Sequence, residues 1–341
     1  MMNNYNSLSY RKLSKLSSLE PDVVGNAPNS KGNTRTSWLM SLIMLTTILF
    51  TGLNSFAQVS GYSFSQSSGT YTPITGGTVV GTPTANTIAG SLDSFNSAAI
   101  TLPFGFVFNG AAQTTVFMNS NGFISFGTTA PSTSTSTPIS TTSTANGIVA
   151  AWAGDLNTFF NLGSRTGDMS WTTEGTAPNR VIVFQWRDWR PAYSTSTTNA
   201  YGFNFQVRLS EINNNVSVVY GPGSFAIGST AFTGTANRQI GLRGTLTSDF
   251  NNRVFTTFST ASTAGTLNSS ANSYNTASNF PASGLTLNWA PPLPCSGTPV
   301  AGTVTPASQA LCTATVPSNL VVSGFSTGVT GITFQWQQSS D

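Results

Sequence analysis

The sequence predicts an all-β protein: an antiparallel β-sandwich or jelly-roll-like domain, preceded by a signal peptide and followed by part of a second sandwich. The chain of 341 residues contains 23 Phe, 8 Tyr and 7 Trp, and these aromatics alternate with Thr, Val and Gly in short stretches. Aromatic and β-branched side chains pack well on a pleated sheet. Only 7% of the residues are charged, and 32 Gly and 17 Pro separate the stretches as turn residues do.

The first part of the chain is typical of a targeting segment. An apolar run (38–50) follows Lys31 and Arg35, and small residues at Ser55 and Ala57 fit the recognition pocket of a signal peptidase. We therefore predict cleavage after Ala57. A membrane anchor is the alternative, but a spanning helix needs roughly 20 apolar residues, which is longer than this run.

The clearest strand, 102–108, places three Phe residues on one face and ends at Asn109-Gly110. Both residues of that pair tolerate a positive φ, so they predict a two-residue hairpin turn. Asn121-Gly122 predicts a second turn of the same kind. Residues 181–186 are almost continuously apolar, as in a strand of a sandwich core, whereas 201–210 alternate and predict one buried and one wetter face.

Two stretches are rich in Ser and Thr: 128–145 and roughly 259–278. Such stretches have little apolar surface to bury and do not order themselves. We expect both to be surface loops of the sandwich domain, because strand patterns continue on either side of each.

Three prolines within 291–294 predict a stiff linker. We therefore divide the chain into an N-terminal extension with a signal peptide (1–57), a sandwich domain (58–290), the linker (291–294) and a partial second domain (295–341). The last part holds too few strands to close a sandwich, so we expect the native protein to continue beyond Asp341.

Cys295 and Cys312 are the two cysteines of the chain. Export would permit a disulfide between them, which the chain-entropy model values at roughly 3 kcal/mol for a loop of this length. Pairing of either cysteine with one beyond Asp341 is the alternative. There is no C-x-x-C pair, which argues against redox catalysis.

Absent residue types exclude several functions. The chain has no His, which removes Ser-His-Asp and Cys-His nucleophiles and His-ligated zinc or haem. The leader holds five of the 13 Lys and Arg and two of the 10 acids, so residues 58–341 hold eight of each, all the basic ones Arg, and have no net charge. We therefore expect no nucleic-acid partner.

Trp186, Trp189 and Tyr193 form a candidate ligand site. An exposed indole offers a flat apolar face to a sugar ring, and Trp189 and Tyr193 lie beyond the apolar strand pattern. Asp188 between the two Trp residues could also belong to the carboxylate pair of a glycosidase. The alternative is that the rings fill the core and the acid lies at a solvated strand end.

Asp155, Asn157 and Asp168 form a candidate calcium site. Two oxygen-bearing side chains lie one residue apart, and Asp168 could join them through a Gly-containing loop. Calcium takes six to eight oxygen ligands, and no repeated Asp-x-Asp pattern is present, so turn formation by Asn and Asp is the alternative. No other cofactor is expected.

The motif at 119–127, with 102–104 before it and 177–181 and 185–186 after it, resembles the N-terminal β-sandwich of large secreted surface proteins of the Bacteroidota. Residues 295–341 resemble the Ig-like repeats that follow that sandwich. The resemblance implies type IX secretion, further Ig-like repeats in cis, and a C-terminal sorting domain that this sequence lacks. The NGFISF stretch is similar, more weakly, to nidogen-type extracellular domains.

The sequence therefore predicts a non-enzymatic exported module, secreted or on the outer cell surface, without membrane insertion after signal cleavage. We expect it to act in adhesion or in binding a surface polymer, with an extracellular glycan or protein as the partner. Two alternatives stay open: a carbohydrate-binding module or part of a glycan-active enzyme, and a purely structural stalk.

Overall fold

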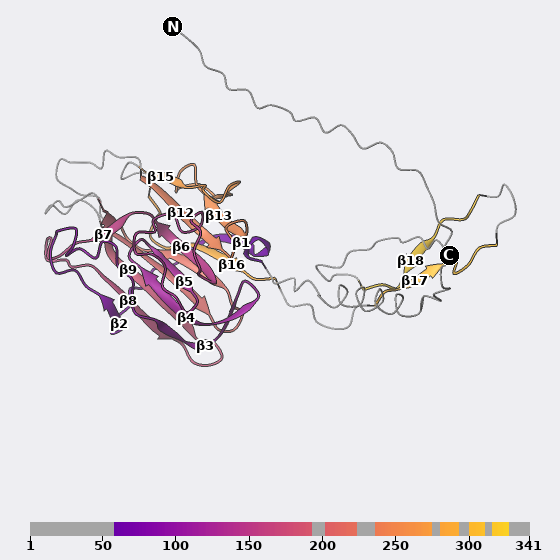
Figure 1. The fold of residues 1–341 in the computed structure, drawn as a ribbon, viewed down its shortest axis with the longest axis horizontal. Helices are drawn as coiled ribbons and strands as arrows, with labels where there is room; N and C mark the ends of the chain where they lie inside the picture. Colours follow the sequence, from indigo (N-terminus) through magenta and orange to yellow (C-terminus); the bar gives the residue numbers. More distant parts are fainter. Residues whose placement is uncertain are drawn as a thin grey trace, which may run out of the picture. The chain divides into compact units, whose positions relative to one another are not determined.

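The computed structural model describes residues 58–192, 202–223, 236–274, 280–292, 300–310 and 316–326. This part of the chain consists of β-strands, turns and one short 3-10 turn, η1 (Val59–Gly61). Two antiparallel sheets form a sandwich (Figure 1), which confirms the predicted fold class. Outside the described residues lie the predicted signal peptide, Tyr193, both cysteines and residues 327–341 of the predicted second domain.

The first sheet contains eight strands, all paired antiparallel. Seven follow one another in space, and the eighth, β7, pairs with the end of β9. In spatial order they are β1 (Ser63–Ser68), β16 (Leu285–Ala290), β11 (Val216–Tyr220), β10 (Phe203–Ser210), β9 (Val181–Pro191), β8 (Asp168–Glu174) and β2 (Thr78–Gly81), with β7 (Leu156–Thr158) beside β9.

The second sheet also contains eight strands, and the eighth, β15, pairs with β12. A separate two-stranded hairpin, β17 (Thr303–Thr305) and β18 (Val321–Ser323), follows later in the chain. In spatial order the second sheet contains β14 (Thr263–Ala264), β13 (Phe250–Val254), β12 (Ala236–Arg243), β6 (Gly147–Ala153), β5 (Phe123–Phe126), β4 (Ala111–Asn119) and β3 (Ile100–Phe108), with β15 (Asn272–Tyr274) beside β12.

Alternation along β3 builds one wall of the core. Its residues are buried and exposed in strict turn, and Phe104, Phe106 and Phe108 are all on the buried side. The strand ends in the predicted two-residue turn: Asn109 and Gly110 have φ of 54° and 72°, and the flanking residues pair across it. The structure thus confirms the predicted strand with alternating Phe residues and its two-residue hairpin turn.

The second Asn-Gly turn is longer than predicted. Asn119 of β4 pairs with Phe123 of β5, so three residues connect the strands. Gly122 has φ of 79°, and a Cβ at that position would lie 2.7 Å from the carbonyl oxygen of Trp152. Glycine is therefore required here both by φ and by a close backbone approach.

Polar tips of aromatic side chains join the two sheets through the core. Trp186, Tyr220 and Trp289 of the first sheet each donate a hydrogen bond to the second sheet. Satisfying these donors is what permits such side chains to be buried, and burial raises the pKa of the Tyr220 hydroxyl well above its ordinary value. The acceptors are, in the same order, Asn119 O (3.0 Å), Ala151 O (2.6 Å) and Asn251 Oδ1 (3.1 Å).

The Ser/Thr-rich segment 128–145 is a loop without strand or helix, as predicted, but it is packed in place on the outer face of the second sheet rather than unordered. Ile139 is fully buried in a small apolar cluster that includes Phe123 and Ile148. The sheet also supplies donors for the backbone of the segment: Arg243 Nη1 donates to the carbonyl of Thr141 at 2.6 Å. The segment does not need its own apolar surface, because buried side chains of the sheet satisfy its peptide groups.

The described part of the second Ser/Thr-rich stretch, 259–274, forms the short strands β14 and β15. Asn252 Nδ2 donates to the carbonyl of Leu267 at 2.9 Å, and Asn272 Oδ1 accepts from Phe255 N at 2.7 Å. The loop prediction is wrong for these two strands, because side-chain amides again hold the backbone in place.

The predicted wetter face of β10 is also covered. Asn204 and Gln206 are buried, because the segment between β1 and β2 crosses the outer face of the first sheet. Gln206 Nε2 donates to the carbonyl of Thr72 at 2.8 Å, and Gln185 Oε1 accepts from the Tyr71 hydroxyl at 3.0 Å. The alternation of apolar and polar residues correctly predicted strand β10, but it did not predict that the polar face of this strand is buried.

Candidate functional site

Strand β9 extends beyond the predicted apolar stretch and contains a β-bulge. Phe205 pairs with Trp186 but Phe203 pairs with Trp189, so two residues of β9, Arg187 and Asp188, oppose the single residue Asn204 of β10. Asp188, inside the bulge, has φ of 60°. The additional residue turns Trp189 back toward the core, since one extra residue reverses the side-chain alternation.

Both Trp residues of the predicted ligand site therefore lie in the core, where each is 0% exposed. Trp186 stacks on Phe205 with ring centroids 5.2 Å apart, and Trp189 Nε1 donates to the carbonyl of Asp168 at 2.9 Å. The expectation that their rings form an exposed sugar platform is wrong, because the bulge keeps both on the inner face.

Two apolar side chains are exposed on the loops beside β7. Ile88 is 62% exposed and Phe160 is 40% exposed. Asn86 joins the two loops: its Nδ2 donates to the carbonyl of Phe160 at 2.7 Å, and its Oδ1 accepts from Phe160 N at 2.9 Å. This pair of bonds fixes the backbone beneath the ring. We call Ile88 and Phe160, together with Asn86, the β7 surface.

Two arginine–aspartate pairs connect β8, β9 and the loop that precedes β8. Arg187 pairs with Asp168, and Arg165 pairs with Asp188. Both carboxylates are almost fully buried, while the arginine side chains reach solvent. Burial raises the pKa of Asp168, and the neighbouring Arg187 opposes that shift. Carboxylates in this setting are held by cations rather than presented to a ligand.

Two guanidinium groups also lie over the ring of Phe159. The distances to the ring centroid are 5.5 Å from Arg165 and 5.7 Å from Arg190. Cations over aromatic faces attract the ring quadrupole. The loop that displays Phe160 is thus supported from below by its neighbour Phe159 and by two arginines.

The residues of the predicted calcium site have other partners. Asn157 Oδ1 accepts from Arg190 Nε at 3.2 Å, and Asp168 pairs with Arg187, while Asp155 is exposed. A cation would have to displace two guanidinium groups, so these contacts give the calcium prediction no support. Within the described ranges, no cluster of three His, Cys, Asp or Glu side chains could hold a metal ion.

Two further acids are paired with arginine in the same way. Glu211 accepts from Arg180 at 2.6 Å, and Glu174 pairs with Arg208. The hydrogen bond from Arg180 lowers the pKa of Glu211. A glycosidase needs two carboxyl groups directed at one bond, whereas these acids are each directed at a cation.

The motif that underlies the family resemblance has a structural role. Asn119, Ser120 and Asn121 are buried, and each side chain holds a different segment of the domain. Their bonds bring together loops that are far apart in sequence. The bonds run from Asn119 Nδ2 to Asn96 Oδ1 (2.7 Å), from Phe95 N to Ser120 Oγ (2.9 Å), from Leu156 N to Asn121 Oδ1 (3.1 Å), and from Asn121 Nδ2 to Thr135 O (2.9 Å).

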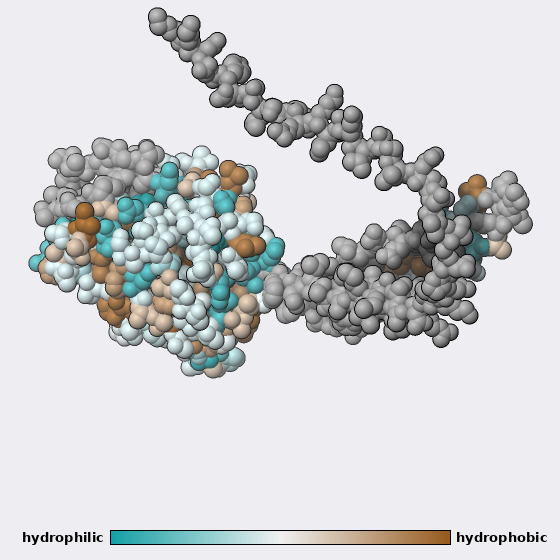
Figure 2. Space-filling view, viewed as in Figure 1, coloured by the Kyte–Doolittle hydropathy of each residue, from teal (hydrophilic) through white to brown (hydrophobic). Residues whose placement is uncertain are grey.

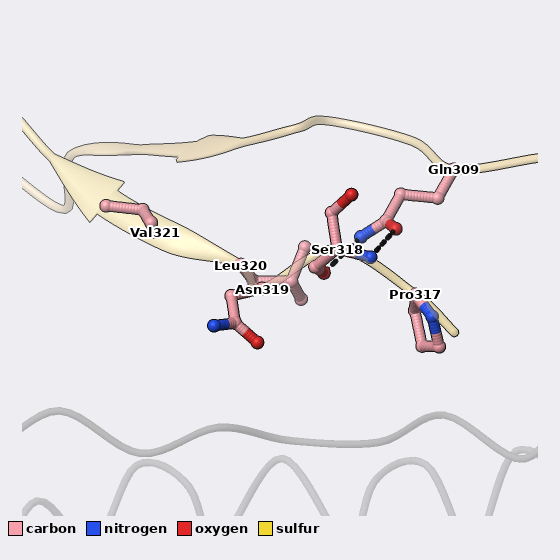
Figure 3. Close-up of a pocket in the computed structure, with 6 residues that line it drawn as sticks. All are labelled: Gln309, Pro317, Ser318, Asn319, Leu320 and Val321. Carbon is pink, nitrogen blue, oxygen red and sulfur yellow. Dashed lines mark hydrogen bonds between the residues drawn. The ribbon is translucent and has the colours of Figure 1, made fainter. Parts of the chain in front are cut away.

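A shallow hollow lies on the segment that contains β18. Gln309 lines it, but the side-chain amide is already bonded to the backbone of Ser318, donating at 2.8 Å and accepting at 2.6 Å (Figure 3). The other lining groups offer little for specific recognition. They are Pro317, Asn319, Leu320 and Val321.

The described domain is therefore a β-sandwich module, and the buried side chains of its motif at 119–127 stabilise the fold. A family model described as NIDO related matches residues 61–291. The chain therefore belongs to the NIDO-related family, whose domains are extracellular modules. The nidogen-type resemblance is thus confirmed at the level of the family, while an origin in the Bacteroidota and type IX secretion stay predictions.

No curated protein and no solved structure matches the chain. In the described part of the chain, no helix is long and apolar enough to cross a membrane.

Proposed function

We propose that this chain is a non-enzymatic exported module that acts in adhesion by binding an extracellular polymer through its β7 surface. The observation that supports this proposal is the exposed ring of Phe160, whose backbone N–H donates to Asn86 Oδ1 and whose carbonyl accepts from Asn86 Nδ2. A loop whose backbone is held in place before binding loses less conformational entropy when a ligand packs on it.

The composition around the ring also favours recognition. Arg165 and Arg187 expose part of their side chains next to the loop, and Arg and aromatic residues are enriched among the side chains that dominate binding energies. On the face of the sandwich seen in Figure 2, small groups of apolar residues lie among larger areas of polar ones.

The pairing of Asp168, Asp188, Glu174 and Glu211 with arginines supports the non-enzymatic part of the proposal. General acid–base catalysis needs a carboxyl group within reach of the substrate proton. Freeing any of these four would require breaking an ion pair.

The test is binding of the purified chain to a glycan array, to insoluble polysaccharide beads and to gelatin-coated plates. Phe160→Ala is compared with Leu246→Ala, which removes an even more exposed apolar side chain (66%, against 40% for Phe160) from a loop of the second sheet. We expect Phe160→Ala to weaken binding by at least about tenfold, as for a central contact residue, and Leu246→Ala to have no effect.

Equal binding by both variants would remove the β7 surface from the proposal. A folded chain that binds none of the three probes would favour the structural-stalk alternative. Cleavage of an arrayed glycan would contradict the non-enzymatic reading and favour the glycan-active alternative.

A further inference from the structure

The strands at the ends of the two sheets differ in how open they are to further pairing. The first sheet ends in β1 and β2, and the second sheet ends in β3 and β14. An edge strand presents unpaired N–H and C=O groups to any chain that can lie alongside it, and proteins usually block such edges.

Three of these four strands are blocked. β2 has four residues and a register shift, and β14 has only two residues. β3 contains Pro103, whose carbonyl accepts from Arg180 Nη1 at 2.9 Å, and the N–H of Val107 donates to Asn214 Oδ1 at 2.8 Å. Short length, irregular register, proline and side-chain caps each prevent strand addition.

β1 has none of these features. It pairs with β16 at six consecutive positions without a shift, and neither strand contains a charged residue or proline. No strand of the described part lies on its other side. β1 is therefore a regular, uncharged edge.

The backbone groups that point away from the sheet can be assigned from the register. Gly69 N donates to Gly284 O at 2.7 Å, which continues the β1–β16 ladder by one position. Antiparallel ladders alternate between bonded and non-bonded pairs, so the serines at odd positions of β1 bond to β16. The N–H and C=O groups of Phe64, Gln66 and Ser68 are then directed outward.

Side chains of β1 contact the rest of the domain without using these outward groups. Gln66 Nε2 donates to the carbonyl of Thr260 at 3.3 Å, and Gln66 Oε1 accepts from Ser262 N at 3.0 Å. Phe64 packs on the guanidinium of Arg253 at 3.8 Å. The edge is therefore held in position and its outward backbone groups have no partner within the described residues.

We propose that β1 pairs antiparallel with β1 of a second copy of this chain, about a two-fold axis at Gln66. Phe64 of each copy then lies opposite Ser68 of the other, and Gln66 lies opposite its own equivalent. Each such pair exchanges both of its N–H···O bonds, so the two first sheets join into one continuous sheet.

The observations favour a second copy because the edge is self-complementary. No charge on β1 or β16 opposes a two-fold contact. With the other three ends blocked, pairing closes at a dimer and does not propagate into a fibre. β2 lies at the opposite end of the sheet from β1, and β7 pairs with β9, so the β7 surfaces of both copies stay free, and bivalent display would raise the avidity of any adhesive contact.

Sedimentation velocity of the purified full chain, from micromolar to millimolar concentration, tests the proposal. The informative variants share one position: Gln66→Pro removes the central outward N–H, and Gln66→Ala removes only the side-chain amide. We expect a concentration-dependent dimer for the unmodified chain and for Gln66→Ala, and a monomer for Gln66→Pro.

A chain that stays monomeric up to millimolar concentration would overturn the proposal, as would dimerisation of Gln66→Pro. Loss of the dimer in both variants would show that the Gln66 side chain makes the dimer contact, and this result would also reject backbone pairing. Should Gln66→Pro fail to fold, hydrogen exchange of the unmodified chain decides: the amides of Phe64, Gln66 and Ser68 must slow as concentration rises, and exchange independent of concentration refutes the pairing.

Discussion

The inner and outer faces of the two sheets are stabilised by different chemistry. The inner faces hold aromatic and aliphatic side chains from both sheets in one cluster. The outer faces hold buried amides and arginines, such as Gln206 and Arg243, whose partners are peptide groups of segments that cross the sheet. Burial alone therefore does not distinguish the core from the surface layer in this protein.

The difference explains why Ser/Thr-rich segments are ordered here. A segment with few apolar side chains cannot gain much from hydrophobic burial, but its peptide groups can be satisfied by fixed side-chain donors and acceptors. Each such bond contributes a net ~1 kcal/mol, and several act on the segment 128–145 together. The order of the outer layer should therefore depend on a few polar residues of the sheets.

The largest expected effect is on the inner face. Trp186→Ala should reduce the free energy of unfolding by about 3–5 kcal/mol, because it leaves a large cavity and removes the bond to Asn119. Urea unfolding measures this value. Phe160→Ala is the exposed aromatic control and should stay within ~0.5 kcal/mol of the unmodified chain; equal losses for the two would contradict the assignment of the core.

On the outer face, Asn121→Ala should cost about 2–4 kcal/mol, since it deprives buried peptide groups of their partners. It should also speed hydrogen exchange between positions 131 and 145. Thr137→Ala, on the exposed side of the same segment, should do neither. An outer segment that exchanges slowly in Asn121→Ala would show that apolar contacts of Ile139 suffice to order it.

The turn between β4 and β5 contacts both the core and the outer segment 128–145. Gly122 is the residue of this turn that tolerates substitution least. Gly122→Ala should destabilise by about 1–3 kcal/mol, because alanine disfavours a positive φ and its Cβ meets the Trp152 carbonyl. Gly105→Ala on β3 is the matched control, since a Cβ there has open space. The midpoint temperature of thermal unfolding should be clearly lower for Gly122→Ala than for Gly105→Ala.

The smallest expected effects concern the pH dependence of stability. The ion pairs of Asp168 and Glu211 should change the free energy of unfolding in opposite directions as pH rises. Burial raises the folded pKa of Asp168, so its contribution to stability is lost as pH rises through that pKa. The bond from Arg180 lowers the folded pKa of Glu211, so its contribution is present above the unfolded pKa of roughly 4.3 and is lost as pH falls through the folded value.

Urea unfolding between acidic and neutral pH tests this difference. Relative to Asp168→Asn, the unmodified chain should lose stability as pH rises; relative to Glu211→Gln, it should gain. If both stability differences change with pH in the same direction, the pKa of Asp168 is set by Arg187 rather than by burial.

The inner layer could be predicted from the sequence, and the candidate site could not. Alternating Phe residues and the pair Asn109-Gly110 fixed a hairpin whose geometry is local. Trp189 was misassigned because the bulge at Asp188 depends on how β9 registers with β10, and Phe160 was not singled out because exposure of a loop aromatic has no sequence period.

By itself the sequence determined an all-β sandwich with aromatic core strands and excluded histidine chemistry, since side-chain alternation and composition are local properties. Only the tertiary structure decided which polar residues are buried and which edge is open. Gln206 and Thr72 are 134 positions apart, and Arg243 and Thr141 are 102 positions apart. Their contact follows from sheet register and chain crossing, which no short stretch of sequence encodes.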